Sequence, residues 1–236
     1  MPFIASTGGA LGYGRAAKVA TVPQGGSIFF NGTTNGNLSV ANDIDFRLRT
    51  GDFTIEWFQY QQALNLYPRV FSIGSYPSQS IAQSIESGNN ALYAWISGAN
   101  LMTNTFSSNL GKWTHVAFCR QGTNFYCFVN GVQVGSTLTN STDFNNTTDV
   151  VRIGNESAMS TDAAFNGYIT NFRWTKGQAL YTANFSVPTR PLTPGPNTKL
   201  LLLAATSGTA TTDSSGSGKT VTAGSAINWN SLTPFT

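Results

Sequence analysis

The side chains that could carry acid–base or nucleophilic chemistry are few in this sequence. His115 is the only histidine among 236 residues, so any Ser–His–Asp or Cys–His arrangement would have to include it. It lies inside an alternating apolar run, and we expect it to be a structural residue without a partner set for acid–base work. Asp52 and Glu56 would share one face of a strand about 13 Å apart, whereas glycosidase carboxylates lie about 5–9.5 Å apart. The sequence therefore predicts no catalytic residues and a protein that is not an enzyme.

Patterns typical of metal sites are equally sparse. Two cysteines and one histidine cannot complete a four-ligand zinc site without other residues. Asp43 and Asp45 are weak candidates for calcium, which takes carboxylate and carbonyl oxygens. The interpretation that we favour is that these two carboxylates simply face solvent, and no other cofactor is predicted.

The two cysteines fall in neighbouring runs, 114–120 and 125–130, joined by a short glycine-containing loop. If the turn centres on Thr123, Cys119 faces Cys127, and directly opposed Cβ atoms lie about 4.5–5.5 Å apart. A cross-strand disulfide is then geometrically possible. Two small, buried, apolar side chains that lie side by side without a bond are the alternative that we favour.

The elements that must position these residues are strands, because apolar and polar residues alternate along the whole chain and no long segment has a helical period. Short turn segments such as Asn130-Gly131 separate the alternating runs. A dozen short strands at this spacing predict an all-β, two-sheet antiparallel β-sandwich. The expected strands are 27–30, 37–40, 53–60, 69–73, 91–96, 114–120, 125–129, 150–153, 167–174, 199–203, 219–222 and 226–229. The residues expected to be buried between the sheets are Ile55, Trp57, Val116, Phe118, Phe128, Ile153, Ile169 and Phe172.

Composition excludes several classes of protein. Charged residues make up 10% of the chain, against about 25% in an average globular domain, and 12% aromatic residues with a net charge of +3 exclude disorder. The cations are scattered, which argues against nucleic-acid binding. The longest aliphatic run, 200–205, is far shorter than a membrane span. The chain holds 30 Thr, 23 Ser and 22 Asn, a polar composition typical of extracellular β folds, adhesins and virion proteins.

Residues 1–26 differ from the rest of the chain. They are rich in glycine and alanine, have no alternating run, and lack the apolar core of a secretory signal. We predict an extended N-terminal arm at 1–26 that docks onto another chain, followed by one domain at 27–236. The residues expected to make that contact are Phe3, Ile4, Leu11, Tyr13 and Arg15.

Four stretches carry a family resemblance: Ser27-Ile-Phe-Phe-Asn-Gly; Gly51-Asp-Phe-Thr-Ile-Glu-Trp-Phe; Trp113-Thr-His-Val-Ala-Phe-Cys-Arg with Phe128-Val-Asn-Gly; and Arg152-Ile-Gly-Asn with Phe165-Asn-Gly-Tyr-Ile-Thr-Asn-Phe-Arg-Trp. Their order resembles the laminin-G-like, concanavalin A-like lectin/glucanase jelly-roll superfamily, of the kind found in tailed-phage structural proteins. The resemblance covers about residues 24–192, and the tail looks like the last strands of the same unit. It implies a jelly roll and leaves the function open, because one fold hosts many functions.

Two functions remain as hypotheses. The first is a non-enzymatic structural protein of a virus particle, a capsid decoration, fibre or tail-associated subunit of a tailed phage. It would be synthesised in the host cytoplasm and would assemble with other virion proteins and with copies of itself. Its support is the N-terminus, which resembles the Met-Pro-Phe-Ile arms of phage structural proteins.

The alternative is a carbohydrate-binding lectin module for host-surface glycans. Aromatic rings near loop or sheet edges could stack on sugar rings, although core or interface packing is the commoner fate of such residues. The candidate stacking residues are Tyr60, Tyr67, Tyr76, Tyr93 and Trp95.

Overall fold

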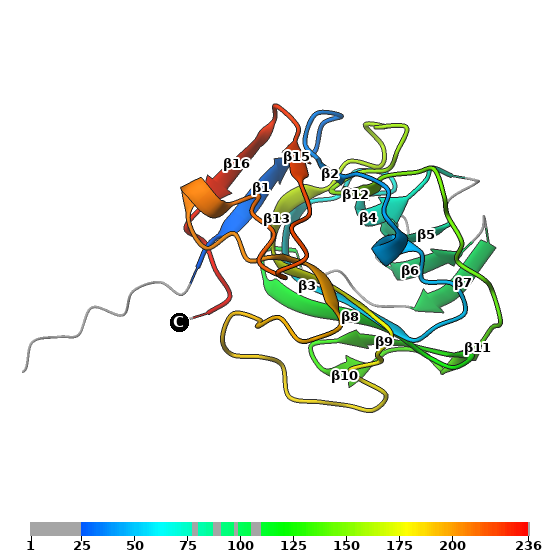
Figure 1. Ribbon diagram of the computed structural model, residues 1–236. Coiled ribbons are helices and arrows are strands. Elements are labelled where there is room, and N and C mark those ends of the chain that lie inside the picture. Colours follow the sequence, from blue (N-terminus) through cyan, green and yellow to red (C-terminus); the bar gives the residue numbers. More distant parts are fainter. Residues whose placement is uncertain (1–24, 77–79, 87–90, 97–98, 105–109, 236) are drawn as a thin grey trace, which may run out of the picture.

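The structure is a computed structural model that describes residues 25–76, 80–86, 91–96, 99–104 and 110–235 (Figure 1). The arm residues at 1–24 lie outside the described residues, as therefore do the five predicted contact residues of the arm. Among the described residues, no helix is long and apolar enough to span a membrane.

Two antiparallel sheets pack face to face, which confirms the predicted all-β sandwich (Figure 1). In the nine-stranded sheet the order is β10-β9-β8-β3-β13-β1-β16, with β11 beside β9 and β14 beside β13. In the seven-stranded sheet it is β15-β2-β12-β4-β5-β6-β7. The larger sheet contains β1 (Ser27–Asn31), β3 (Phe53–Ala63), β8 (Trp113–Gln121), β9 (Asn124–Val129), β10 (Val132–Gln133), β11 (Leu138–Thr139), β13 (Asn166–Lys176), β14 (Thr198–Leu202) and β16 (Ile227–Asn230). The smaller contains β2 (Leu38–Val40), β4 (Arg69–Ile73), β5 (Ile81–Glu86), β6 (Ala91–Ile96), β7 (Ala99–Asn104), β12 (Val151–Ile153) and β15 (Val221–Ala223).

The tail belongs to the same unit, because β14 pairs with β13, β15 with β2 and β16 with β1. Short 3-10 turns lie at Ile44–Phe46 and Ser207–Thr209. Strands β5 and β7 and the two-residue strands β10 and β11 were not among the expected strands. The sequences of β5 and β7, IAQSIE and ANLMTN, alternate less regularly than those of their neighbours, and pairing with β4 and β6 makes them strands.

Aromatic rings from both sheets fill the space between them. Trp57 of β3 lies 5.7 Å from Phe71 of β4, between ring centroids, and Trp174 of β13 lies 6.0 Å from the same ring. Both tryptophans are fully buried. Seven of the eight predicted core residues belong to this inner cluster; the exception, Phe128, is fully buried on the opposite face of its sheet.

The predicted cysteine pairing is wrong by one residue. The β8–β9 loop consists of Gly122 and Thr123 alone, so Cys119 pairs with Tyr126 and Cys127 pairs with Phe118. Since successive side chains of a strand point to opposite faces, this shift places the two cysteines on different faces of the sheet. Both are buried and neither forms a disulfide, but they do not lie side by side as the favoured alternative expected, because Cys127 belongs to the inner cluster and Cys119 to the outer face.

A second apolar cluster covers the outer face of the larger sheet. It comprises Ala117, Cys119, Tyr126 and Phe128, with Tyr181 and Phe185 packed over them. The last two belong to the proline-containing connection 177–197 between β13 and β14, which passes across β8, β9 and β10 (Figure 1). Phe128 therefore faces this connection, which is the reason for its burial outside the main core.

The β9–β10 turn has the predicted conformation and also makes room for the connection. Asn130 and Gly131 have φ angles of 48° and 77°, as a tight hairpin requires. The Gly131 carbonyl accepts a 2.9 Å hydrogen bond from the Phe185 N–H. A Cβ atom at Gly131 would lie 2.1 Å from the Phe185 carbonyl oxygen, so only glycine permits this close approach.

Candidate functional site

A cleft of about 400 Å³ opens at the start of β4, between the turn that follows this strand and the loop after β12. Two predicted stacking residues line it: Tyr67 is 43% exposed and Tyr76 is 59% exposed. The other lining residues are Arg69, Glu156, Ser160, Asp162 and Ala163. Two aromatic rings thus face solvent beside charged and hydroxyl groups.

Backbone hydrogen bonds hold the walls of this cleft together. The N–H groups of Tyr67 and Arg69 donate to the carbonyls of Asp162 and Ala163, both at 2.8 Å. The Asn65 side-chain amide donates to three carbonyls at 2.8–3.0 Å, those of Gly32, Thr161 and Ala164. The last two belong to the segment that follows β12. These bonds fix the backbone at Tyr67 and in the loop after β12, and the side chains of Tyr67 and Tyr76 present exposed surface to the cleft.

Charged groups form the floor of the cleft. Arg69 is buried, donates from Nη1 to the Tyr67 carbonyl at 3.2 Å, and places Nε 3.9 Å from Glu156 Oε2. The same glutamate oxygen accepts the Tyr76 N–H at 3.3 Å. Asp162 is exposed at the rim. The cleft therefore offers a guanidinium donor and, at its rim, the Asp162 carboxylate next to two aromatic rings, which suits a polar ligand with an apolar side.

Tyr60, another predicted stacking residue, does not join this cleft. Tyr60 lies on the outer face of β3, where its ring packs 5.7 Å from Trp113 and 5.9 Å from Tyr168. Tyr93 and Trp95 are in β6, and their side chains lie outside the described residues.

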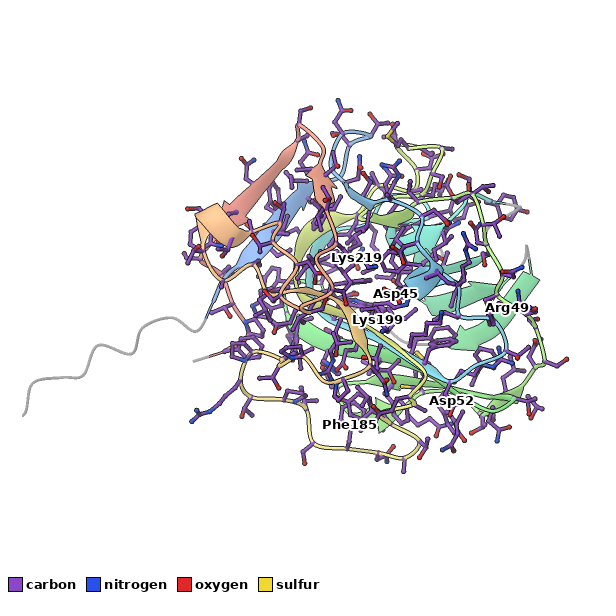
Figure 2. The ribbon with its side chains drawn as sticks, in the orientation of Figure 1. Asp45, Arg49, Asp52, Phe185, Lys199 and Lys219 are labelled. Carbon is purple, nitrogen blue, oxygen red and sulfur yellow. The ribbon has the colours of Figure 1, made fainter. Side chains whose placement is uncertain are left out.

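The calcium candidates Asp43 and Asp45 keep part of their surface exposed, as expected, and are also ion-paired with lysine, which was not expected. Lys219 Nζ lies 3.0 Å from Asp43 Oδ2. It also lies 2.7 Å from Asp45 Oδ2, and Lys199 Nζ lies 3.7 Å from Asp45 Oδ1; Figure 2 shows these last three residues close together. The backbone N–H of Asp45 and then the Lys219 ammonium lower the pKa of Asp43. The Lys219 ammonium group thus lies next to both carboxylates, where a calcium ion would have to lie. In the described part of the chain, no cluster of three or more His, Cys, Asp or Glu side chains could hold a metal ion.

A buried ionic cluster on the outer face of the larger sheet was not expected. Glu56 Oε2 lies 3.1 Å from His115 Nε2 and accepts the Tyr181 hydroxyl at 3.1 Å, while Oε1 accepts Arg173 Nε at 2.8 Å. Glu56 and His115 are fully buried and contact each other, so His115 has a structural partner that the sequence analysis did not identify. Burial alone would raise the pKa of Glu56, but the His115 hydrogen bond and the Arg173 charge outweigh it and lower the pKa.

This cluster fastens the 177–197 connection to the sheet. Tyr181 reaches Glu56 from the connection, and Arg173 Nη1 donates to the Thr193 carbonyl at 2.9 Å. Both carboxylate oxygens are occupied by protein donors, so the group lacks a free face toward a substrate. In the sequence, the sign of this cluster is that Glu56 stands in a continuous run of residues that tend to be buried. Such a run indicates a strand that is covered on both faces.

Comparison with known proteins supports the fold. A candidate carbohydrate-binding protein from Bacteroides ovatus superimposes with a TM-score of 0.64 at 14% identity, covering 91% of this chain and 62% of that protein. A heptameric SAP-like pentraxin from Limulus polyphemus gives 0.59 at 16% identity, covering 89% of this chain and 97% of that one. Domain 4 of the extracellular arabinanase AbnA from Geobacillus stearothermophilus, solved with arabinotriose, gives 0.51 at 19% identity, covering 65% and 71%.

These identities establish a shared fold and nothing finer. A search of curated protein sequences returns no match. The Laminin_G_3 family model, described as the concanavalin A-like lectin/glucanases superfamily, matches residues 31–180, which run from the end of β1 to just before Tyr181. The chain therefore belongs to the concanavalin A-like lectin/glucanase superfamily.

Proposed function

We propose that the protein is a non-enzymatic carbohydrate-binding module whose glycan lies in the cleft between Tyr67 and Tyr76. The observation that carries the proposal is the pair of solvent-exposed tyrosine rings on a frame held by backbone hydrogen bonds. The fold neighbours add support at the level of the fold, since one is described as a candidate carbohydrate binder and another was solved with arabinotriose.

Each group in the cleft has a role in this proposal. The tyrosine rings stack on the C–H face of a sugar, which is its apolar side. Arg69 donates to hydroxyl or carboxylate oxygens, and Asp162 and Ser160 at the rim accept from hydroxyls. A volume of about 400 Å³ lies near the lower end of the usual range for small-ligand sites, about 300–1,000 Å³, and suits a short saccharide.

Binding without turnover is part of the proposal. Glu156 Oε2 already accepts the Tyr76 N–H and lies beside Arg69, so it is engaged in holding the floor of the cleft. In the larger sheet, Glu56 is enclosed by protein donors. Neither carboxylate is presented to a ligand in the way that a general acid needs.

Screening the full chain on a glycan array and then measuring affinity by calorimetry tests the proposal. Tyr67→Ala and Tyr76→Ala should each weaken binding of the best ligand about tenfold, since each removes one ring contact. Leu66→Ala is a matched control, because Leu66 is exposed beside Tyr67 but does not line the cleft. Absence of any glycan ligand, or equal loss in the control, would contradict the proposal.

The role in a virus particle is a second proposal, carried by the apolar arm at 1–26. In this proposal the arm joins the domain to other virion proteins or to further copies of the chain, and the domain is displayed at the particle surface. Deleting residues 2–20 should leave a folded domain that no longer enters the particle. Normal incorporation of the truncated chain would exclude this role and leave the carbohydrate-binding proposal intact.

A further inference from the structure

Four aromatic side chains form a row across the outer face of the larger sheet, one from each of four strands that lie side by side (Figure 1). Phe29 of β1 pairs with Tyr168 of β13. Tyr168 in turn pairs with Tyr60 of β3, and Tyr60 pairs with Trp113 of β8. Successive ring centroids are 5.1, 5.9 and 5.7 Å apart. All four side chains are half-buried, so this row, which we call the aromatic ladder, keeps apolar surface accessible along about 14 Å of sheet.

Segments of the chain itself cover neighbouring rings of this face. Phe185 of the 177–197 connection lies 5.4 Å from Phe128, between ring centroids, and Phe128 is fully buried. Phe235 of the tail lies 5.1 Å from Phe58, which is 3% exposed. The ladder therefore differs from these rings in how far it is covered. Accessible aromatic surface of this kind is typical of protein interfaces, in which Tyr, Trp and Phe are enriched.

The arm at 1–24, which lies outside the described residues, has a sequence suited to this surface. Residues 1–14 contain no Asp, Glu, Lys or Arg, and they carry the apolar side chains of Phe3, Leu11 and Tyr13. The ladder rings carry no charge either, so contact between the two would take no ionised group out of water. Arg15 follows directly, and a guanidinium group stacks well on an aromatic face. The arm and the ladder are therefore complementary in charge and in apolar character.

The course of the chain at the start of β1 favours the ladder of another copy over the ladder of the same copy. β1 runs from Ser27 to Asn31, so the arm begins on the side of Ser27 that faces away from Phe29. The Ser27 hydroxyl donates to the Leu232 carbonyl at 2.7 Å, which places the C-terminal tail over β1 between the start of the arm and Phe29. Residues 1–24 can span up to about 80 Å when extended, which is enough to reach a neighbouring molecule.

We propose that the arm of one copy of this chain binds the aromatic ladder of a second copy, and that two copies exchange arms to form a dimer. The apolar side chains of the arm pack on the ladder rings, and Arg15 lies over one of them. Reciprocal exchange uses both arms and both ladders, so the assembly closes with twofold symmetry. This dimer rests on the second proposed function, in which the arm joins the domain to other chains, and it makes the ladder of a second copy the surface that the arm binds.

Photocrosslinking in the full chain tests where the arm binds. The photoreactive residue p-benzoylphenylalanine replaces Phe3, and ¹⁴N-labelled and ¹⁵N-labelled chains are mixed, equilibrated and irradiated. Mass spectrometry of the digest should find peptides in which the arm of one isotope is joined to a ladder segment of the other. Crosslinks confined to single chains, or mixed crosslinks that map away from β1, β3, β8 and β13, would overturn the proposal.

Light scattering measures the dimer and the contribution of each side to it. Tyr60→Ala and Tyr168→Ala in the ladder should each raise the dimer Kd about tenfold, because each removes one ring contact. Leu11→Ser in the arm should raise it by a similar factor. The controls are Ile44→Ala, which removes an apolar side chain that is 68% exposed in the first 3-10 turn, and Thr7→Ala in the arm. Both should leave the Kd unchanged, and a melting curve confirms that each variant is folded.

Two results of the light-scattering experiment would overturn the proposal. One is a full chain that stays monomeric at about 0.5 mM. The other is a dimer that Leu11→Ser weakens and that both ladder variants leave unchanged, because the arm would then bind another surface. The role in a virus particle is tested separately, since deletion of residues 2–20 reports on entry into the particle whether or not the chain dimerises.

Discussion

Two regions of this molecule contain the same three residue types, a glutamate, an arginine and a tyrosine, and use them differently. On the outer face of the larger sheet, Glu56 accepts hydrogen bonds from Arg173 and Tyr181 in a site closed to solvent. In the cleft of the smaller sheet, Glu156 lies near Arg69, and the Tyr76 ring is 59% exposed. What differs is the cover, because the 177–197 connection closes the first region and nothing among the described residues closes the second.

The comparison teaches that residue type alone does not distinguish a structural cluster from a binding site. In the closed region the tyrosine hydroxyl and both carboxylate oxygens have protein partners, so these interactions contribute to stability. In the open region backbone bonds hold the frame and leave the aromatic rings at the surface. Mutations should therefore change stability in the first region and ligand affinity in the second.

The largest expected effect is that of Glu56→Ala. It leaves Arg173 without its carboxylate and removes the acceptor of two further groups, so we expect a loss of about 3–5 kcal/mol in the free energy of unfolding. Glu156→Ala should cost less, about 1–3 kcal/mol, because it removes the acceptor of the Tyr76 N–H and the carboxylate 3.9 Å from the buried Arg69 Nε. Urea denaturation of both variants checks the difference. Equal losses would show that the two regions are energetically alike.

Phe185→Ala should open the closed region, with a loss of about 2 kcal/mol because a packed but partly exposed ring is removed. Burial raises the pKa of Cys119 to about 12, and this thiol belongs to the cluster against which the Phe185 and Tyr181 rings pack. The variant should let a thiol reagent reach Cys119 faster. Cys127 lies in the inner cluster and serves as the internal control. Labelling of Cys127 at the same accelerated rate would indicate global unfolding instead.

Acid should lower the free energy of unfolding through the closed region, by less than the Glu56→Ala and Phe185→Ala substitutions do. The pKa of Glu56 is lowered in the folded protein, so the unfolded chain takes up this proton first as the pH falls. The contribution is complete above the ordinary glutamate pKa of 4.5 and is lost as the pH falls through the lowered folded value. Measured between pH 6 and about pH 3, the free energy of unfolding should fall less steeply in Glu56→Gln than in the unmodified protein. Parallel slopes would contradict this assignment.

The smallest effect on stability should come from the open region. Tyr67→Ala and Tyr76→Ala remove exposed rings, so the free energy of unfolding should change by no more than about 0.5 kcal/mol. Circular dichroism melts check this, alongside the loss of glycan affinity expected for the same variants. A large drop in melting temperature would show that these rings are structural, as those of the closed region are.

Alternation along the chain was sufficient to predict the sandwich and most of its strands. Ile55 and Trp57 of β3 and Val116 and Phe118 of β8 are buried between the sheets as predicted, because the face on which a side chain lies depends only on its place within its own strand. The exposed pair Tyr67 and Tyr76 was also predicted, although as two of five candidates and not as one cleft.

Pairing between segments was the point at which prediction failed. A loop of two residues instead of three was enough to separate Cys119 from Cys127, since one residue of register exchanges the two faces of a strand. Lys219 lies 174 positions from Asp45 in the sequence, and their ion pair exists only because β14 and the segment after it return to the sheet beside the 3-10 turn at Ile44–Phe46. No local pattern encodes such a contact.

The sequence by itself determined which residues form strands and which face of each strand is apolar, because these properties depend on neighbours within a few positions. Only the tertiary structure decided which outward-facing groups are covered. Glu56 and Phe128 are closed off by a connection whose path depends on Gly131, Arg173 and Tyr181 acting together, whereas Tyr60 and Trp113 remain at the surface. Covering a sheet face requires contacts between distant segments, and their free energy exists only once the whole chain has folded.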